Sequence, residues 1–125
     1  MDFKLELVAV PVSDVDRAKA FYADQVGFHP DHDHQVNDDL RFVQLTPRGS
    51  ACSIAIGTGI TATTPGSGPG ITLVVPDIDR VRAELAQRGV NISEVQDMPW
   101  GARHAHFTDP DGNPWDLQEV PAPRA

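Results

Sequence analysis

The sequence contains little that would tie the chain to a disulfide framework or to a membrane. Its single cysteine, Cys52, has no internal partner, so we expect no disulfide and a reducing, cytoplasmic location. The longest apolar run, near residues 7–12, is interrupted by Pro11 and falls far short of the ~20 residues that cross a bilayer. No basic segment precedes a hydrophobic stretch, so we expect no secretion signal.

Basic residues are also scarce. The chain has 10 Lys and Arg against 18 Asp and Glu, a formal net charge of −8. Such a surface repels phosphate backbones and anionic lipids, so we expect neither nucleic acid nor a membrane as a partner. At 125 residues and 40% hydrophobic content, the chain has the size and composition of one compact domain with a buried core.

What the sequence does contain is an internal repeat. A shift of 63 residues places five residues of the first half on identical residues of the second half. These residues are Val12, Asp14, Asp16, Arg17 and Ala20, which fall on Val75, Asp77, Asp79, Arg80 and Ala83. With a shift of 62, Gly27 falls on Gly89. Because the offset is about half the chain length, the pattern predicts two copies of one structural unit.

Each copy has the pattern of a strand, a helix and further strands. Residues 5–12 and 71–75 are rich in Val, Ile and Leu and favour buried strands. Asp77 is a suitable cap for the second helix, and Gly27 and Gly89 suit the position that ends a helix. Short strand candidates follow the helices at residues 40–45, 53–56, 90–95, 103–108 and 115–120.

The pattern therefore predicts an α+β fold made of two tandem βαβββ modules in a single domain, residues 1–125. Module one spans residues 1–57, a Gly- and Pro-rich linker spans 58–70, and module two spans 71–121. One such unit would leave a sheet face uncovered, so we expect the units to pair within or between chains.

Two motifs carry a resemblance to a known family. Asp109-Pro110-Asp111-Gly112-Asn113, followed by Trp115-Asp116-Leu117, is a tight turn entering a strand. The segment from Val12-Ser13-Asp14 through Phe21-Tyr22 to Val26-Gly27-Phe28 forms the N-terminal counterpart. With the duplication, residues 5–120 resemble the vicinal oxygen chelate (glyoxalase/bleomycin resistance/dioxygenase) superfamily. That group includes glyoxalase I, extradiol dioxygenases, methylmalonyl-CoA epimerase, fosfomycin-modifying enzymes and metal-free bleomycin-binding proteins.

The resemblance implies a curved mixed sheet with a concave cavity and a homodimer. It also implies metal ligands on the first and last strands of each module. The matching places are Leu7, Ala55, Ile71 and Asp116. The first three have no lone pair to offer a cation, and one Asp cannot hold a divalent metal. We therefore expect no metal at the usual place and no cofactor.

Strand alternation then assigns neighbours to the cavity, on the assumption that the former ligand places face inward. Trp100 and Arg103 are predicted to flank the mouth, where Trp stacks on a flat ligand and Arg pairs with an anionic group. The predicted ligand-binding set is Leu7, Phe42, Gln44, Ser53, Ala55, Ile71, Leu73, Trp100 and Arg103.

His104, His106 and Asp116 are predicted to share the cavity face, and three interpretations stay open. The two histidines are structural residues on a wet sheet face, or they orient a ligand or move a proton with Asp116 holding the tautomer, or all three form a relocated metal site. A second cluster, His29 to His34, favours a solvated strand or loop, although His32 and His34 share a face that suits adventitious Ni²⁺ or Zn²⁺ binding.

The function predicted first is metal-independent binding of a hydrophobic or aromatic small molecule by a homodimer, for resistance or sequestration. The alternative is a lyase, isomerase or dioxygenase of the same superfamily that uses His104, His106 and Asp116 as acid/base groups or as a relocated metal site. A purely structural or partner-binding module is the third hypothesis.

Overall fold

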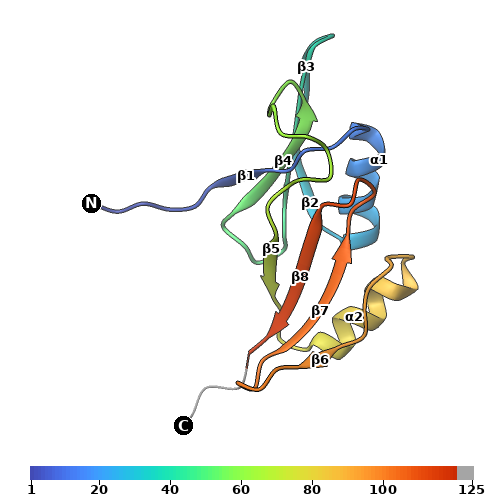
Figure 1. Ribbon diagram of the computed structural model, residues 1–125. Helices are drawn as coiled ribbons and strands as arrows, with labels where there is room; N and C mark the ends of the chain where they lie inside the picture. The colour runs from blue at the N-terminus through green and yellow to red at the C-terminus, as the bar shows by residue number, and fades with distance from the viewer. Residues whose placement is uncertain (121–125) are drawn as a thin grey trace. The chain divides into compact units, whose positions relative to one another are not determined.

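The computed structural model describes residues 1–120, which form two compact units with one four-stranded sheet each (Figure 1). The first unit consists of Met1–Pro69 and Asp109–Asn113, and the second of Gly70–Thr108 and residues 114–120. The final residue of the predicted second module, Pro121, lies outside the described residues. Within those residues no helix is long and apolar enough to cross a membrane.

The first unit holds strands β1 (Leu7–Ala9), β2 (His29–Asn37), β3 (Leu40–Thr46) and β4 (Ser53–Thr58) in the order β1-β4-β3-β2. Strand β1 runs parallel to β4, and the other pairs are antiparallel. Helix α1 (Val15–Ala20) continues as a π-helix, η1 (Phe21–Val26). It begins at Asp14, whose carboxylate accepts a hydrogen bond from the Arg17 amide, and ends at Gly27 with φ 92°.

The second unit repeats this plan. Its elements are β5 (Ile71–Val74), α2 (Ile78–Gln87), β6 (Gln96–Asp97), β7 (Arg103–Thr108) and β8 (Pro114–Glu119), with sheet order β5-β8-β7-β6. Asp77 caps α2 by accepting from the Arg80 amide. In both sheets the first strand pairs with the last in parallel and the helix follows the first strand. The predicted α+β fold of two βαβββ modules is confirmed.

One predicted strand is wrong. Residues 90–95 contain three β-branched side chains, but only Ile92 forms an isolated bridge, to Phe107, and the regular strand β6 starts at Gln96. Val90 and Ile92 are buried, so their apolar character serves packing and not strand pairing. The Ser93 side chain instead accepts a hydrogen bond from the His106 amide.

In each unit the core lies between the helix and one face of the sheet. Strand alternation turns every second side chain toward the helix. The alternate side chains form the opposite, helix-distal face, on which Ser53 and Ala55 are also buried. Trp115, whose placement the sequence left undecided, is buried and stacked on Phe107 at 6.0 Å. The main core residues are Phe21, Tyr22, Val43, Leu45, Ile54 and Ile56 in the first unit and Ile78, Leu85, Ala105, Phe107, Trp115 and Leu117 in the second.

The Asp109–Asn113 turn is held by a dense hydrogen-bond network in the first unit. Asp109 is only 4% exposed, and its Oδ2 accepts from Tyr22 Oη at 2.6 Å and from Asn113 Nδ2 at 2.7 Å. Its Oδ1 accepts from the backbone amides of Asp111 and Asn113. Asn113 Nδ2 also donates to the Pro11 carbonyl. With four donors on one buried carboxylate, this motif fastens the turn to the first helix and strand.

Candidate functional site

Strand register identifies equivalent positions on the helix-distal faces of the two sheets. Gln44 lies opposite Ala55 in the first sheet, and His106 lies opposite Asp116 in the second. Two residues earlier on β3 and on β7, Phe42 and His104 occupy corresponding positions on the same faces. The equivalent sets are therefore Phe42, Gln44 and Ala55 in the first module and His104, His106 and Asp116 in the second.

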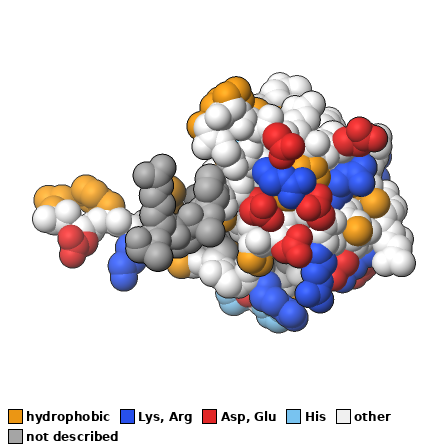
Figure 2. Space-filling view, turned by 90° about the horizontal axis from the view of Figure 1, so that it is seen from below, with side chains coloured by type: hydrophobic (Ala, Val, Ile, Leu, Met, Phe, Trp, Pro, Cys, Tyr) orange, Lys and Arg blue, Asp and Glu red, His pale blue; other side chains and the backbone are white. Residues whose placement is uncertain are grey.

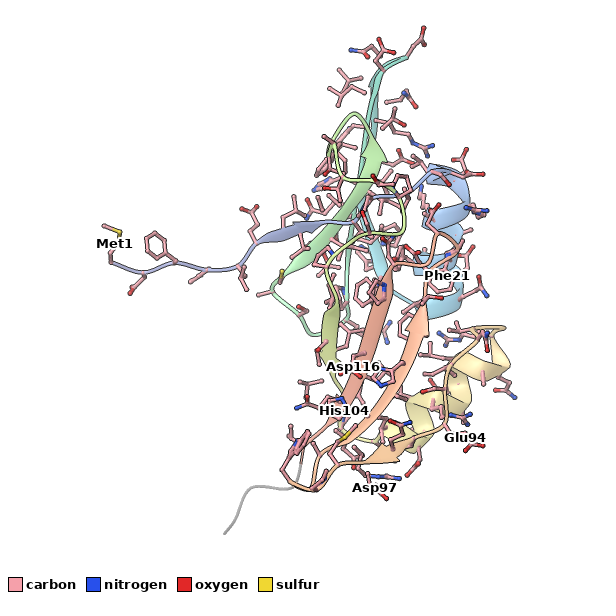
Figure 3. The ribbon with its side chains drawn as sticks, viewed as in Figure 1. Met1, Phe21, Glu94, Asp97, His104 and Asp116 are labelled. Atoms are coloured by element: carbon pink, nitrogen blue, oxygen red, sulfur yellow. The ribbon has the colours of Figure 1, made fainter. Side chains whose placement is uncertain are left out.

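The structure brings His104, His106 and Asp116 together as the sequence predicted. Figure 3 labels His104 and Asp116 in the second sheet. His104 Nδ1 lies 2.7 Å from Asp116 Oδ2 in a hydrogen bond, and His106 Nδ1 lies 3.0 Å from Oδ1. The two imidazole rings are 6.4 Å apart between centroids. The side chains of His104 and Asp116 are largely buried, at 14% and 19% exposed, whereas His106 is 53% exposed.

The two carboxylate oxygens of Asp116 are not equally satisfied. His104 is aligned for a hydrogen bond to Oδ2, but His106 approaches Oδ1 without the alignment that a hydrogen bond requires. Oδ1 is shut off from solvent and has no hydrogen-bond partner within residues 1–120. An acceptor left in this state costs about 1–3 kcal/mol of stability. Within residues 1–120, Oδ1 of Asp116 is the side-chain polar atom that is shut off from solvent without a hydrogen bond.

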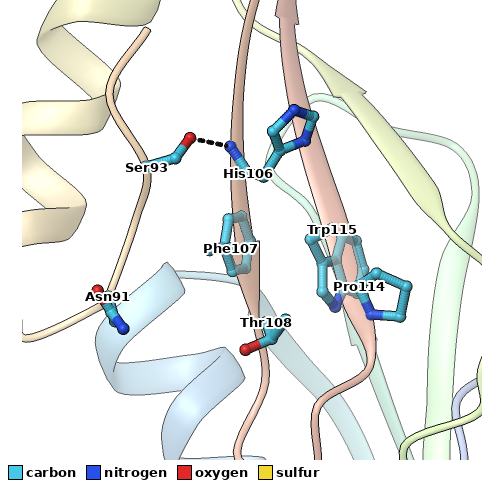
Figure 4. A pocket seen from close by; sticks show the side chains of 7 residues that line it. All are labelled: Asn91, Ser93, His106, Phe107, Thr108, Pro114 and Trp115. Atoms are coloured by element: carbon cyan, nitrogen blue, oxygen red, sulfur yellow. Dashed lines mark hydrogen bonds between the residues drawn. The ribbon is translucent and has the colours of Figure 1, made fainter.

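A pocket of about 480 Å³ opens beside His106 on the same unit (Figure 4). His106, Thr108 and Pro114 lie on the helix-distal face, because His106 pairs with Asp116 and Thr108 with Pro114. The His106 amide donates to Ser93 Oγ, and the His106 carbonyl accepts from the Ser93 amide, both at 2.8 Å. The lining residues are Asn91, Ser93, His106, Phe107, Thr108, Pro114 and Trp115.

The first sheet presents five of the predicted ligand-binding residues on its own helix-distal face. Pairing of Leu7 with Ser53 and of Gln44 with Ala55 puts these four side chains on one side, together with Phe42. Its polar groups satisfy one another. Gln44 Nε2 donates to Ser53 Oγ at 3.3 Å, and the Thr46 and Ser53 hydroxyls are 2.6 Å apart. The Thr46 hydroxyl also donates to Asp31.

The predicted orientation of Ile71 and Leu73 is wrong. They lie opposite Trp115 and Leu117, which are core residues of the helix side, whereas Thr72 lies opposite Asp116. These two side chains therefore face away from the histidines.

The error was a displacement of one residue. Leu7 stands seven residues before Asp14, and the equivalent place seven residues before Asp77 is Gly70, not Ile71. Since side chains alternate along a strand, a displacement of one reverses the face. Glycine offers no side-chain donor either, so the absence of a ligand at this place stands.

Arg103 does not join the histidine face, because its guanidinium is already paired. Its Nη1 lies 2.7 Å from Asp79 Oδ2, and its Nε lies 2.9 Å from Asp97 Oδ1. Hydrogen bonding to Asp79 and then Asp97 raises the pKa of Arg103 above its usual range, and Arg103 lowers the pKa of Asp79. The predicted role at a cavity mouth is therefore not supported by its contacts. Trp100 lies in the turn after β6 and is 70% exposed.

The same ion network exists in the first module. Arg41 binds Asp33 through Nε at 3.0 Å and Asp16 through Nη1 at 2.8 Å. The repeat at a shift of 63 residues already pairs Asp16 with Asp79, and the shift of 62 that pairs Gly27 with Gly89 also pairs Arg41 with Arg103, a match that the sequence analysis did not use. Basic and acidic side chains are interspersed on the surface in Figure 2.

The residues at the family's ligand places do not fit a divalent metal. Leu7, Ala55 and Gly70 have no donor side chain, and Asp116 accepts a hydrogen bond from His104. In the part of the chain that is described, no group of three or more His, Cys, Asp or Glu is arranged to hold a metal ion. A relocated site at His104, His106 and Asp116 remains a prediction.

The His29–His34 cluster lies on β2, where every residue is exposed, which agrees with a solvated strand. His32 and His34 lie on one face with ring centroids 5.7 Å apart, in stacked orientation. His32 pairs with Gln44 and His34 with Phe42, so the two histidines lie on the helix-distal face of the first sheet.

Comparison with known proteins places this architecture in a family. The chain is 36% identical to TnmS3, an antibiotic binding protein from Streptomyces sp. CB03234, over 96% of this chain and 98% of that one, with a TM-score of 0.85. A glyoxalase/bleomycin resistance protein from the same organism is 38% identical over 91% of this chain and 98% of that one, with a TM-score of 0.78.

A curated relative, the uncharacterized protein YetH of Bacillus subtilis (strain 168), is 30% identical over 90% of this chain and 94% of its own length. Residues 4–117 match the family model described as Glyoxalase/Bleomycin resistance protein/Dioxygenase superfamily. The predicted family is confirmed: the chain belongs to the glyoxalase/bleomycin resistance protein/dioxygenase superfamily.

Proposed function

We propose that this protein binds a hydrophobic or aromatic small molecule without a metal, for resistance to that molecule or for its sequestration. Family membership and the likeness to TnmS3, an antibiotic binding protein, support small-molecule binding. The likeness covers 96% of this chain, so it includes the sheets and the loops between them.

One observation carries the metal-free part of the proposal. The chain keeps the fold, the helix caps and the Asp109–Asn113 turn, yet aliphatic residues or glycine occupy three of the four places for metal ligands. The helix-distal sheet faces combine apolar side chains such as Leu7 and Phe42 with a few polar ones, which is the usual composition of a small-molecule site. The net charge of −8 favours neutral or cationic ligands.

The proposal includes a homodimer and the cytoplasmic location expected from the sequence. The N-terminal segment extends away from its sheet in Figure 1, and Phe3, Leu5 and Leu7 alternate along it with exposed side chains. Strand β1 is also the edge of its sheet. Apolar side chains on an unpaired edge favour contact with a second copy. Light scattering that shows only monomer at micromolar concentration would refute the dimer.

The test of this function uses tag-free protein in two measurements. Fluorescence of a neutral hydrophobic dye, followed by calorimetry with planar aromatic natural products, should show saturable binding of about one ligand per site. Binding should survive treatment with a chelator, because no metal takes part. Absence of binding across the dye and the natural products would contradict the proposal, and binding lost to the chelator would contradict its metal-free form.

An acid/base enzyme is the second candidate, favoured by the His104–Asp116 hydrogen bond. A carboxylate on Nδ1 fixes the tautomer of an imidazole and leaves Nε2 for proton transfer, which is the arrangement of a catalytic base with its orienting group. If this candidate is right, incubation with a bound ligand yields a product, and His104→Ala abolishes its formation while ligand binding persists. Unchanged turnover in both His104→Ala and His106→Ala would eliminate it.

A further inference from the structure

We propose that Asp116 Oδ1 is the anchor for a hydrogen-bond donor of the ligand, and that the His106 side chain moves aside to admit it. The inference rests on the proposed function and narrows the ligand to an aromatic molecule that carries a hydroxyl or a protonated amine. An ionised carboxylate oxygen only accepts, so it selects donors and rejects the corresponding ethers.

The fold has no need of this carboxylate. In the first module the equivalent position is Ala55, opposite Gln44, in a sheet of the same order and pairing. An identical frame therefore forms without the acid, and the unpaired oxygen is not a requirement of β-sheet packing. Asp109 shows that this chain can satisfy a buried carboxylate fully when its role is structural, since four donors converge on it.

The side chain of His106 can rotate while the backbone of its strand stays fixed. Its backbone amide and carbonyl are both bound by Ser93, so the main chain is fixed on either side of the Cα. Its side chain is 53% exposed, approaches Asp116 Oδ1 at 3.0 Å without an aligned hydrogen bond and stacks beside His104, so the imidazole is held less firmly than that of His104. His106 lines the 480 Å³ pocket and Asp116 does not, so rotation of the imidazole about χ1 is the movement that would open Oδ1 to a ligand in this pocket.

His104 has the complementary role of a fixed partner. It is 14% exposed and hydrogen-bonded to Oδ2, so it holds the carboxylate in one orientation with Oδ1 toward His106. A ligand donor that reaches Oδ1 gains a charge-assisted hydrogen bond and removes the cost of an unpaired acceptor. The same ligand with its donor methylated cannot form this hydrogen bond and leaves Oδ1 without a partner.

The experiment compares a naphthalenediol with its dimethyl ether by calorimetry. The wild-type protein should bind the diol about tenfold or more tightly than the ether, as expected for one hydrogen bond to a charged group. Asp116→Ala, which copies Ala55 of the first module, should lose this ratio while binding the ether as the wild type does. His106→Ala should keep the ratio and bind the diol at least as tightly, because the imidazole no longer covers the oxygen.

Thr108→Ala is the matched control, since Thr108 lines the same pocket on the same strand and should leave the ratio unchanged. Equal binding of diol and ether by the wild type would overturn this inference and leave the proposed function standing. Loss of diol binding in His106→Ala would overturn the displacement and make His106 itself the anchor. If neither naphthalene nor the neutral dye binds, the proposed function fails and the inference with it.

Discussion

The two modules share a frame, by which we mean the sheet order, the capped helix and the arginine network, but they differ in the residues on the helix-distal sheet face. Both place a capped helix after the first strand, and both pair one arginine with an aspartate of the helix and an aspartate of the second strand. On the helix-distal face the correspondence ends. Phe42, Gln44 and Ala55 of the first module stand where the second has His104, His106 and Asp116.

This difference distinguishes the residues that the fold requires from the residues that are present for another reason. A feature that recurs at the repeat offset, such as the arginine network, belongs to the frame. A polar group found in one module only is not demanded by that frame. In the first sheet Ser53 hydrogen-bonds to both Gln44 and Thr46, whereas in the second sheet one oxygen of Asp116 has no hydrogen bond. The oxygen that we propose as the anchor for a ligand therefore lies on the second face, and the first face has no counterpart.

The largest predicted effect concerns the buried carboxylate of Asp109, which the second module has in its turn and the first module lacks at the equivalent position. Pro47 and Gly49 of the first module match Pro110 and Gly112 of the second at an offset of 63, but Thr46 stands in the place of Asp109. Asp109→Ala leaves Tyr22 Oη and Asn113 Nδ2 without this acceptor, so we expect a loss of about 3–5 kcal/mol in the free energy of unfolding. Urea denaturation measures it.

Arg17→Ala is a control for that experiment, because Arg17 contacts the same turn through Asp111 from a side chain that is half exposed. It should cost no more than about 1 kcal/mol. If Asp109→Ala unfolds at the same urea concentration as the wild type, the turn is not the fastening that its hydrogen bonds indicate.

The second prediction compares the two arginines directly. Arg41 is 17% exposed and Arg103 32%, and the Asp33 partner of Arg41 is far less exposed than the Asp79 and Asp97 partners of Arg103. Solvent screens the second network more, so Arg41→Ala should destabilise by about 1 kcal/mol and Arg103→Ala by less. Thermal unfolding of both variants in low and high salt tests this order. An equal loss in the two would mean that burial does not distinguish the networks.

The third prediction concerns pH and follows from Asp33. Hydrogen bonds from Arg41 and Lys19 hold the pKa of the Asp33 carboxyl well below its usual range. A carboxyl whose folded pKa is lowered adds stability above its unfolded pKa, about 3.9, and loses it as the pH falls toward the folded value. Asp33→Asn should therefore be less stable than the wild type at neutral pH, and the difference should shrink below about pH 4. A difference independent of pH would contradict this.

Much of the frame could be predicted from the sequence because its signals are local. The caps Asp14 and Asp77 and the helix-ending Gly27 are recognised by residue type and spacing, and the repeat then doubles each signal. The strand at residues 90–95 failed because Val90 and Ile92 are apolar for packing, and β-propensity does not distinguish the two causes.

Which sheet face a side chain occupies depends on the strand register, and the spacing of residues in the sequence determines that register less securely. His104, His106 and Asp116 were assigned correctly from their own strand alternation, whereas Ile71 was reversed by a displacement of one residue. The unpaired state of Asp116 Oδ1 could not be predicted, since it depends on the angle of one imidazole.

The smallest predicted effect is the most direct test of the comparison between the modules. The triple variant His104→Phe, His106→Gln and Asp116→Ala gives the second face the residues of the first. Because the first module already folds with these side chains, we expect a change of no more than about 1 kcal/mol in the free energy of unfolding. The change should be toward greater stability, since the variant removes an unpaired buried acceptor. Calorimetric unfolding measures this.

The same variant should no longer discriminate the naphthalenediol from its ether. A loss of several kcal/mol would instead show that the three side chains support the second sheet, and the difference between the faces would then be structural. Stability retained together with lost discrimination would separate the two roles cleanly, since the frame would be intact and only the recognition of the donor would be gone. The residues that distinguish the faces would then be the residues that select the ligand.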